Sequence, residues 1–366
     1  MSYNCFTASI QFRFYTMFAF WCRIPRLVAV ALVGLVIAGC EPDVSFFSQT
    51  TDSSSMSEQE VPYYYLELSV LDARTLTTVN GVWIQEGDGR TSLSFNSPTN
   101  ANLIGKGNTV TVTVKPTTVA AGDPPKSGKL ADADSVRPST VEEAKVTAKI
   151  KKITSGTVTP ESGETLAKKT LGEVVEKKEE ALRKEFLENL ESAPPEKKKA
   201  LADQEEELTS VTFPIEMELT FDSEDVPSFR ERFVEAPVIE DTSALKDFAM
   251  NLRKRAEGQD FDRLYQAFKH KFEEYDEAYP SQAQADNRTW FEDMLQENIF
   301  SNDPLLNFER EDLELREWSG GRVWEVNVDR GKGLTDQFFL TRPTEKGRAF
   351  MDIFVGKVDG ELKVVR

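Results

Sequence analysis

Cysteine and histidine are scarce in this sequence. The three cysteines are Cys5, Cys22 and Cys40, and the single histidine is His270. The chain after Cys40 therefore contains no thiol, which excludes disulfides, cysteine-ligated zinc and a cysteine nucleophile from that part. A Ser-His-Asp site would have to use His270, and the sequence has neither a Gly-x-Ser-x-Gly elbow nor a phosphate-binding glycine loop.

An excess of basic residues is also missing. The chain has 44 Lys and Arg against 62 Asp and Glu; the residues before Cys40 hold three Arg and no acid, which leaves 41 bases against 62 acids and a net charge of −21. A nucleic acid backbone requires a concentrated basic face, and we find none, so we expect no nucleic acid partner. The same charge should keep the body of the protein off anionic lipid, except at an anchor.

The apolar run of residues 27–39 is too short for an ordinary membrane span. It has thirteen residues without a charge, whereas a helix needs about 20 to cross the hydrocarbon core. Its flanks follow the order of a signal peptide, with Arg23 and Arg26 before it, Ala38 and Gly39 at its end and Cys40 next. The alternative is a buried core strand or helix that ends in a chance cysteine.

Residues 37–40, Ile-Ala-Gly-Cys, resemble the lipobox of bacterial lipoproteins, although that family prefers Leu where Ile37 stands. The resemblance implies that residues 1–40 are a signal peptide and that Cys40 is acylated, with palmitate among its chains, and becomes the new N-terminus. Both Met1 and Met17 are candidate starts of translation, because another apolar, aromatic stretch precedes the basic residues.

Lipidation of Cys40 would tether the protein without spanning the membrane. Two or three acyl chains anchor firmly, whereas one chain binds only marginally. In the lipoprotein family an Asp after the cysteine favours the inner membrane, but this chain has Glu41 and Pro42. We therefore expect a lipid-anchored protein of the cell envelope, on the outer membrane and facing the periplasm.

Two segments have the composition of spacers. Residues 41–60 contain five acids, no base and many Ser and Thr, which is typical of a flexible stalk. Residues 223–240 are assigned to a second linker, which leads into the C-terminal domain.

Alternating apolar residues predict an antiparallel β-sandwich over residues 61–222. Turn signals separate its strands at Asn80-Gly81, residues 87–89 and residues 105–107. Residues 87–89 lack the surrounding oxygen ligands of a calcium loop and are assigned to a turn. The alternation returns at residues 211–221, where Pro214 suits an edge strand or a bulge.

A long charged insertion, residues 116–208, interrupts the predicted sandwich. Residues 116–140 have the composition of a disordered segment. Residues 163–192 are predicted to be helical, because one stripe of that helix carries Leu171, Val175, Leu182, Phe186 and Leu190. Two interpretations are open for this helix: it contacts a partner helix or forms a short coiled coil, or it lies solvated on its own domain.

Residues 241–366 change from helical to strand periodicity. Amphipathic helices are expected at 243–278, interrupted near Gly258, and at 288–299. The period then falls to two, with turns at residues 319–321 and at Asp359-Gly360. The whole chain is therefore assigned to the α+β class, and in this domain helices are expected to pack on a curved antiparallel sheet.

This order of elements, together with the ending FVGKVDGELKVVR, resembles the nuclear transport factor two-like (cystatin-like) family. The resemblance covers about a third of the chain. It implies a cone-shaped cavity between helices and sheet. It implies no particular chemistry, because the family includes isomerases, dehydratases, hydrolases and inert binding or assembly modules.

The inward faces of the predicted sheet are apolar. One strand carries Trp324, Val326 and Val328, and a later strand carries Ala349, Met351, Ile353 and Val355, with Asp352 opposite. His270 has Glu273 and Glu274 at helical spacing, which suits a metal or an acid–base pair, or else it is an exposed histidine in a charged run. We assign no catalytic residue, metal or cofactor.

The other face of the predicted sheet carries Trp318, Phe339, Phe350 and Phe354, and we take these four residues as candidate binding residues. Large apolar side chains require a cover. The β-sandwich ranks first as that cover, ahead of a second copy of the domain or a partner protein.

The sequence thus predicts a non-catalytic binding or assembly module, anchored through Cys40 and meeting a protein partner in the cell envelope. The alternative is a cavity-based enzyme or small-ligand carrier in the C-terminal domain.

Overall fold

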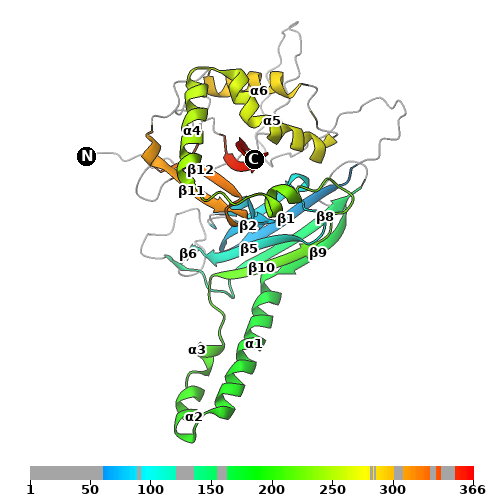
Figure 1. Ribbon diagram of the computed structural model, residues 1–366. Helices are drawn as coiled ribbons and strands as arrows, with labels where there is room; N and C mark the ends of the chain where they lie inside the picture. The colour runs from blue at the N-terminus through cyan, green and yellow to red at the C-terminus, as the bar shows by residue number, and fades with distance from the viewer. Residues whose placement is uncertain are drawn as a thin grey trace, which may run out of the picture. The chain divides into compact units, whose positions relative to one another are not determined.

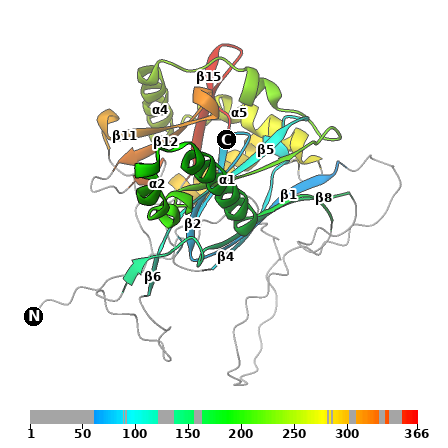
Figure 2. The ribbon, with the colours of Figure 1, turned by 90° about the horizontal axis from the view of Figure 1, so that it is seen from below.

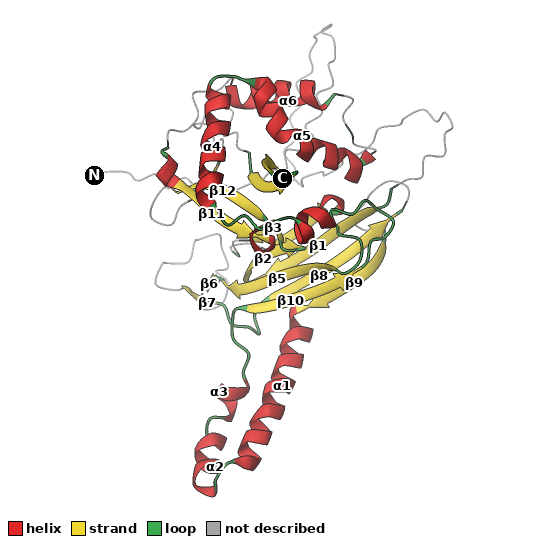
Figure 3. Ribbon diagram, viewed as in Figure 1, coloured by secondary structure: helices red, strands yellow, loops and turns green. Residues whose placement is uncertain are grey.

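The structure is a computed structural model that describes residues 61–366 apart from residues 88, 90–91, 121–135, 155–162, 281–282, 284–285, 301–307, 330–334 and 339–350. All described residues belong to one compact unit, Ser54–Arg366. They form a mixed α and β protein with antiparallel sheets (Figure 3), which confirms the α+β class. The predicted signal peptide and stalk lie outside the described residues.

The first two sheets each contain four antiparallel strands. The first has the order β4 (Leu93–Pro98), β1 (Tyr63–Leu71), β8 (Lys145–Ile153) and β9 (Glu164–Thr170). The second has the order β10 (Ile215–Phe221), β5 (Asn108–Pro116), β2 (Ala73–Val79) and β3 (Val82–Gly87). The chain passes from β1 to β2 through Asp72, whose φ of 53° lies in the left-handed region. The continuous segment 63–79 therefore contributes one strand to each of the two sheets.

Alternating apolar side chains give these two sheets a shared core. In β5, Val110, Val112 and Val114 are all 0% exposed, and the residues between them are partly exposed. They belong to one hydrophobic cluster with Leu66 of β1 and Met217 of β10. Each such side chain contributes roughly 1.5–3 kcal/mol when it is fully buried. The period of two in the sequence predicts this core correctly.

Two of the predicted hairpin turns are confirmed. Asn80 and Gly81 join β2 to β3 with φ values of 51° and 74°. Asp359 and Gly360 join β14 (Ile353–Val358) to β15 (Glu361–Val364) with φ values of 51° and 78°. A two-residue hairpin loop of this type needs positive φ at both central residues, which Asn-Gly and Asp-Gly supply at low cost.

The prediction that residues 116–208 are a non-sheet insertion is wrong for β8 and β9. β8 pairs with β1 along its whole length, so it lies inside the first sheet. Its inward residues Val146, Ala148 and Ile150 are buried, while lysines occupy outward positions. The high charge of the outward face conceals the alternation in the sequence. β9 likewise replaces about the first two turns of the helix predicted over residues 163–192.

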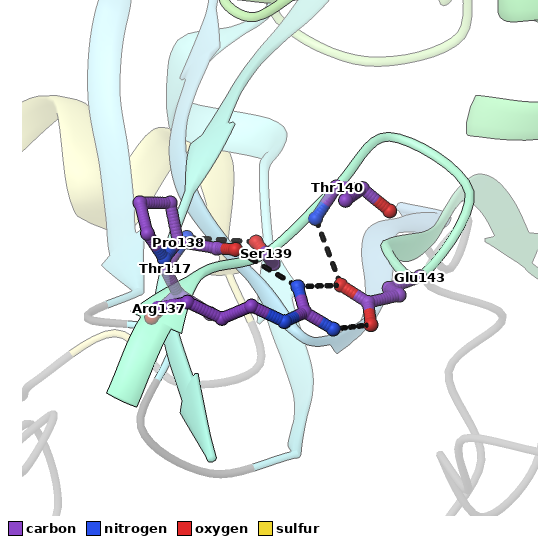
Figure 4. A network of polar contacts seen from close by, with 6 residues as sticks. All are labelled: Thr117, Arg137, Pro138, Ser139, Thr140 and Glu143. Carbon is purple, nitrogen blue, oxygen red and sulfur yellow. Dashed lines mark hydrogen bonds and ion pairs between the residues drawn. The ribbon is translucent and has the colours of Figure 1, made fainter. Parts of the chain in front are cut away.

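The segment predicted to be disordered also contains paired backbone at both of its described ends. β6 (Thr118–Ala120) pairs with β7 (Val136–Pro138). Next to this pair, the Ser139 N–H donates to the Thr117 carbonyl at 2.7 Å, and Ser139 Oγ accepts from the Thr117 N–H at 3.0 Å (Figure 4). The disorder prediction is therefore wrong for these residues.

Glu143 closes the turn that follows β7. Its carboxylate pairs with both terminal nitrogens of Arg137 and accepts from the Thr140 N–H at 2.9 Å (Figure 4). The bonds from Arg137 and Thr140 lower the pKa of Glu143 to about 2. Because this pair is exposed to solvent, we assign it the role of fixing the turn rather than of stabilising the fold.

A helical arm, residues 171–209, leaves the sheets after β9. It consists of α1 (Leu171–Ser192), α2 (Pro195–Ala202) and α3 (Glu205–Thr209). Thr170 caps α1 through a capping box with Glu173. α2 and α3 return alongside α1 (Figure 1), and Figure 2 shows the arm from below, in front of the strands. The arm then leads back into β10.

The predicted apolar stripe of α1 is only partly covered. Leu171 and Phe186 are buried, whereas Val175, Leu182 and Leu190 are half-buried. Leu187 and Leu208 are 50% and 45% exposed. The arm therefore buries little apolar surface of its own and leaves two leucines in solvent.

The three helices predicted in the C-terminal part are confirmed as α4 (Thr242–Glu257), α5 (Phe261–Ala278) and α6 (Asn287–Leu295). Each begins at an aspartate whose side chain accepts backbone N–H bonds, namely Asp241, Asp260 and Asp286. The third sheet has the order β11 (Leu313–Trp318), β12 (Val323–Asp329), β14 and β15, and β13 (Thr335–Gln337) also pairs with β12. The helices and one face of this sheet share a second core.

A buried asparagine holds the loop before β5. Asn108 is 0% exposed. Its side-chain oxygen accepts from the Ile104 N–H at 2.8 Å, and its nitrogen donates to the Gly105 carbonyl at 2.7 Å and to Ser223 Oγ at 2.9 Å. The asparagine therefore joins the loop to the segment that follows β10.

We expect Asn108→Ala to lower the free energy of unfolding by about 2–4 kcal/mol, because it leaves several buried polar groups without partners. Urea denaturation followed by circular dichroism measures this change. Asn96→Ala, an exposed position on β4, is the control and should change stability by less than about 0.5 kcal/mol. Equal effects of the two substitutions would contradict the assignment.

Candidate functional site

The second face of the third sheet packs against β2 and β3. A third hydrophobic cluster combines Val82 of β3 with Trp318, Val323 and Phe354 of the third sheet. The rings of Trp83 and Phe354 stack with centroids 6.2 Å apart. The turn at Asn80-Gly81 also meets the turn at residues 319–321 here, because the Ser319 N–H donates to the Gly81 carbonyl at 3.0 Å.

The structure places two of the four candidate binding residues in this cluster. Trp318 is 7% exposed and Phe354 is 4% exposed. Other residues of the same chain cover these two side chains, as the first-ranked of the three predicted covers requires. Trp318 and Phe354 therefore offer no free surface to another molecule. Phe339, Phe350 and the predicted lipidation residue Cys40 lie outside the described residues.

A buried carboxylate and an arginine accompany Trp318. The Trp318 indole N–H donates to Glu325 Oε2 at 3.1 Å, and the Arg316 guanidinium lies 4.5 Å from the indole ring centroid. Burial raises the pKa of Glu325 above its usual range. Arg316 Nη1 also lies 3.4 Å from Glu86 Oε2 of β3. The contacts of Arg316 with Trp318 and Glu86 therefore connect the third sheet to the second.

The inward face of the third sheet is filled by aromatic side chains. Phe268 and Phe272 of α5, Phe291 of α6 and Phe338 after β13 are between 1% and 4% exposed. Val326 and Val328 of β12 and Ile353 and Val355 of β14 complete this core, with Trp324 and Met351 at its edge. The predicted apolar inner faces are therefore confirmed for these residues. Ala349 lies outside the described residues.

Charged side chains gather where α5 meets the last strand and a π-helical turn, η3 (Glu231–Glu235). Arg232 of η3 is 6% exposed and donates to the Val365 carbonyl at 3.1 Å. Its other terminal nitrogen pairs with Glu274 and lies 3.0 Å from His270 Nε2. Burial and the nearby Arg366 lower the pKa of Arg232, but an arginine beside a carboxylate stays charged.

His270 lies beside both Arg232 and Glu274. Arginine is only a donor, so the contact with Arg232 is a hydrogen bond only while Nε2 carries no proton. Burial and the charge of Arg232 lower the pKa of His270 below its usual value, against the raising effect of Glu273 and Asp359. Glu274 Oε1 lies 3.0 Å from His270 Nε2. Of the two acids predicted at helical spacing, the structure brings Glu274 to the histidine and pairs Glu273 with Lys269.

Arg366 belongs to the same cluster. Its guanidinium lies 5.5 Å from the ring centroids of Phe233 and Tyr275. It is 9% exposed, and its backbone carbonyl accepts from the Phe354 N–H at 3.1 Å. No sequence pattern marks Arg232 as a site residue, and Arg366 is noted only as the last residue of the ending FVGKVDGELKVVR. The two are brought together only by the fold.

A surface groove of about 800 Å³ is lined by residues of α4 together with Phe308 and Glu309. Charged side chains dominate its lining, with Arg253 at its base, where the guanidinium lies 4.2 Å from the Phe308 ring. Arg253 Nε also donates to Glu257 at 2.7 Å.

Two searches of the described residues gave negative results. No cluster of three or more His, Cys, Asp and Glu side chains suited to a metal ion occurs in that part of the chain. None of its helices combines the length and the apolar character needed to cross a membrane.

Comparison of the chain with protein-family models, with curated proteins and with solved structures gave no match. The resemblances to bacterial lipoproteins and to the nuclear transport factor two-like family therefore stay predictions.

We expect His270 to make folding stability depend on pH. Because its pKa is lower in the folded than in the unfolded chain, the unfolded chain binds more protons, and stability falls as pH drops from about 6.5 through the folded pKa. His270→Gln retains a polar side chain without a titrating ring. Thermal unfolding from pH 7.5 to 5 should show a smaller loss for the variant, and parallel profiles would contradict the prediction.

Proposed function

We propose that this protein is a lipid-anchored binding or assembly module of the cell envelope and not an enzyme. In this proposal the first two sheets act as a β-sandwich, the C-terminal helices and sheet act as a cystatin-like domain, and acylated Cys40 tethers both to the outer membrane. Tethering raises the local concentration of a protein at a membrane, which favours a scaffold more than an enzyme of soluble substrates.

The filled interior of the C-terminal part supports a non-catalytic role. An enzyme of this architecture needs polar groups that converge on an open pocket. Here Phe268, Phe272 and Phe291 pack against one another, with ring centroids between 5.0 and 6.3 Å apart, and occupy the space between α5, α6 and the sheet. This aromatic packing is the observation that carries the proposal.

The helical arm is the surface we assign to a partner. It carries Leu187 and Leu208 in solvent, on helices otherwise dominated by charged side chains. An arm that buries so little of its own apolar surface adds little stability, and the arm extends away from the sheets (Figure 1). The interpretation that α1 contacts a partner helix therefore extends to α2 and α3.

One observation favours the alternative, a cavity-based enzyme or small-ligand carrier. Burial lowers the pKa of Lys271 on α5 to about 8, against the raising effect of Asp352. A lysine in this state can act as a base or hold an anion at neutral pH. The alternative thus centres on charged residues at the end of the sheet rather than on its filled interior.

The anchor is tested by labelling. Cells that express the full chain and are fed radiolabelled palmitate should incorporate label into the protein, and Cys40→Ser should abolish the incorporation and release the protein from membranes. Cys22→Ser is the matched control and should keep the label. Label that persists in the Cys40 variant would refute the anchor.

The arm is tested by crosslinking in intact cells. Leu187→Glu together with Leu208→Glu should remove specific crosslinked partners without loss of folding, because both side chains are exposed. Leu71→Glu is the matched control, since Leu71 is also exposed, at 39%, but lies at the end of β1. Crosslinked partners that are identical in both variants would show that the arm is a spacer.

A further inference from the structure

The guanidinium of Arg366 is buried with two of its donors unused. It is 9% exposed, and no acceptor lies within hydrogen-bond distance of Nε or Nη2. A buried donor without an acceptor costs about 1–3 kcal/mol, and more for a charged group. This arrangement therefore calls for an acceptor that the described residues do not supply.

The two unused donors have a defined geometry. The Nε and Nη2 protons of an arginine point along the same edge of the planar guanidinium, which is the edge that binds carboxylate or phosphate through two parallel bonds. Phe233 and Tyr275 hold the guanidinium at equal ring-centroid distances of 5.5 Å. These contacts fix the direction of the unused edge before any ligand binds.

The neighbouring groups add positive charge. Arg232 also has a buried Nε without an acceptor, and Arg366 lowers the pKa of both Arg232 and Lys271 through its charge. Three acids act on this group: Glu274 pairs with Arg232 and lies beside His270, Glu277 acts on Arg232, and Asp352 acts on Lys271. Two buried guanidinium groups and the half-buried Lys271 therefore carry positive charge in one region of a protein of net negative charge.

We propose that Arg366, with Arg232 and Lys271, forms a binding site for a compact oxyanion, either a phosphate or a carboxylate group. The anion accepts two parallel bonds from the free edge of Arg366, and Arg232 Nε and the Lys271 ammonium supply further positive charge. The site depends neither on the lipid anchor nor on the helical arm, so a negative result for this site would not contradict the proposed function, and the reverse also holds.

The test uses the full chain, purified in detergent, and two probes, inorganic phosphate and acetate, each against sodium chloride of equal ionic strength. Saturable binding of phosphate, measured by calorimetry and by a rise in melting temperature, supports a phosphate ligand. Saturable binding of acetate supports a carboxylate ligand. Binding of neither probe above the chloride control overturns the proposal.

Arg366→Lys retains the positive charge but removes the planar edge, and it should weaken binding about tenfold or more. Arg263→Gln is the control, because the Arg263 side chain is 74% exposed and pairs with Asp260; it should bind as the wild type does. Equal affinity of all three proteins overturns the proposal.

A measurement on the wild type alone covers the case in which the Arg366 variant fails to fold. The nuclear magnetic resonance signal of the Arg366 Nε–H, assigned by selective labelling, should shift and saturate as the bound probe is added. A signal that does not move at probe concentrations that saturate calorimetric binding would place the anion elsewhere and overturn the assignment.

Discussion

The third sheet presents apolar side chains on both of its faces, and the architecture of the described chain depends on covering both. α4, α5 and α6 cover one face. β2, β3 and the loop around Ala101 cover the other, through Val82, Trp83 and Ile104. A sheet with two apolar faces is not stable in water alone, so the N-terminal sheets and the C-terminal part form one unit.

The same packing explains why residues 223–240, predicted to be a linker, contain buried side chains. Phe229, Phe233 and Ile239 are between 2% and 5% exposed, and the Ile239 N–H donates to the Gly321 carbonyl at 2.8 Å. The segment therefore fastens the two parts to each other. The course of this segment buries Arg232 between α5 and the end of β15. Isolated buried charge is costly, which explains why Glu274 and the ring of His270 lie beside this arginine.

The arm has a different relation to the rest of the molecule. Its first turn packs on β8 and β9, but the remainder of α1 contacts mainly α2 and α3. Removal of its exposed leucines therefore leaves the main cores unchanged. The stable cores and the partly solvated arm separate the residues that hold the fold from those available for contact with another molecule.

The sequence by itself determined the local features. Caps at Asp241, Asp260 and Asp286, the turns at Asn80 and Asp359, and the apolar stripes of α4 to α6 depend on residues within a few positions of one another, so they can be read from spacing alone. Tertiary structure decided the rest. Membership of β8 in the first sheet, the cover over Trp318 and Phe354, and the meeting of Arg232, His270 and Arg366 join residues from 38 to more than 200 positions apart. No local pattern encodes such contacts, because they arise only when two apolar faces must be buried together.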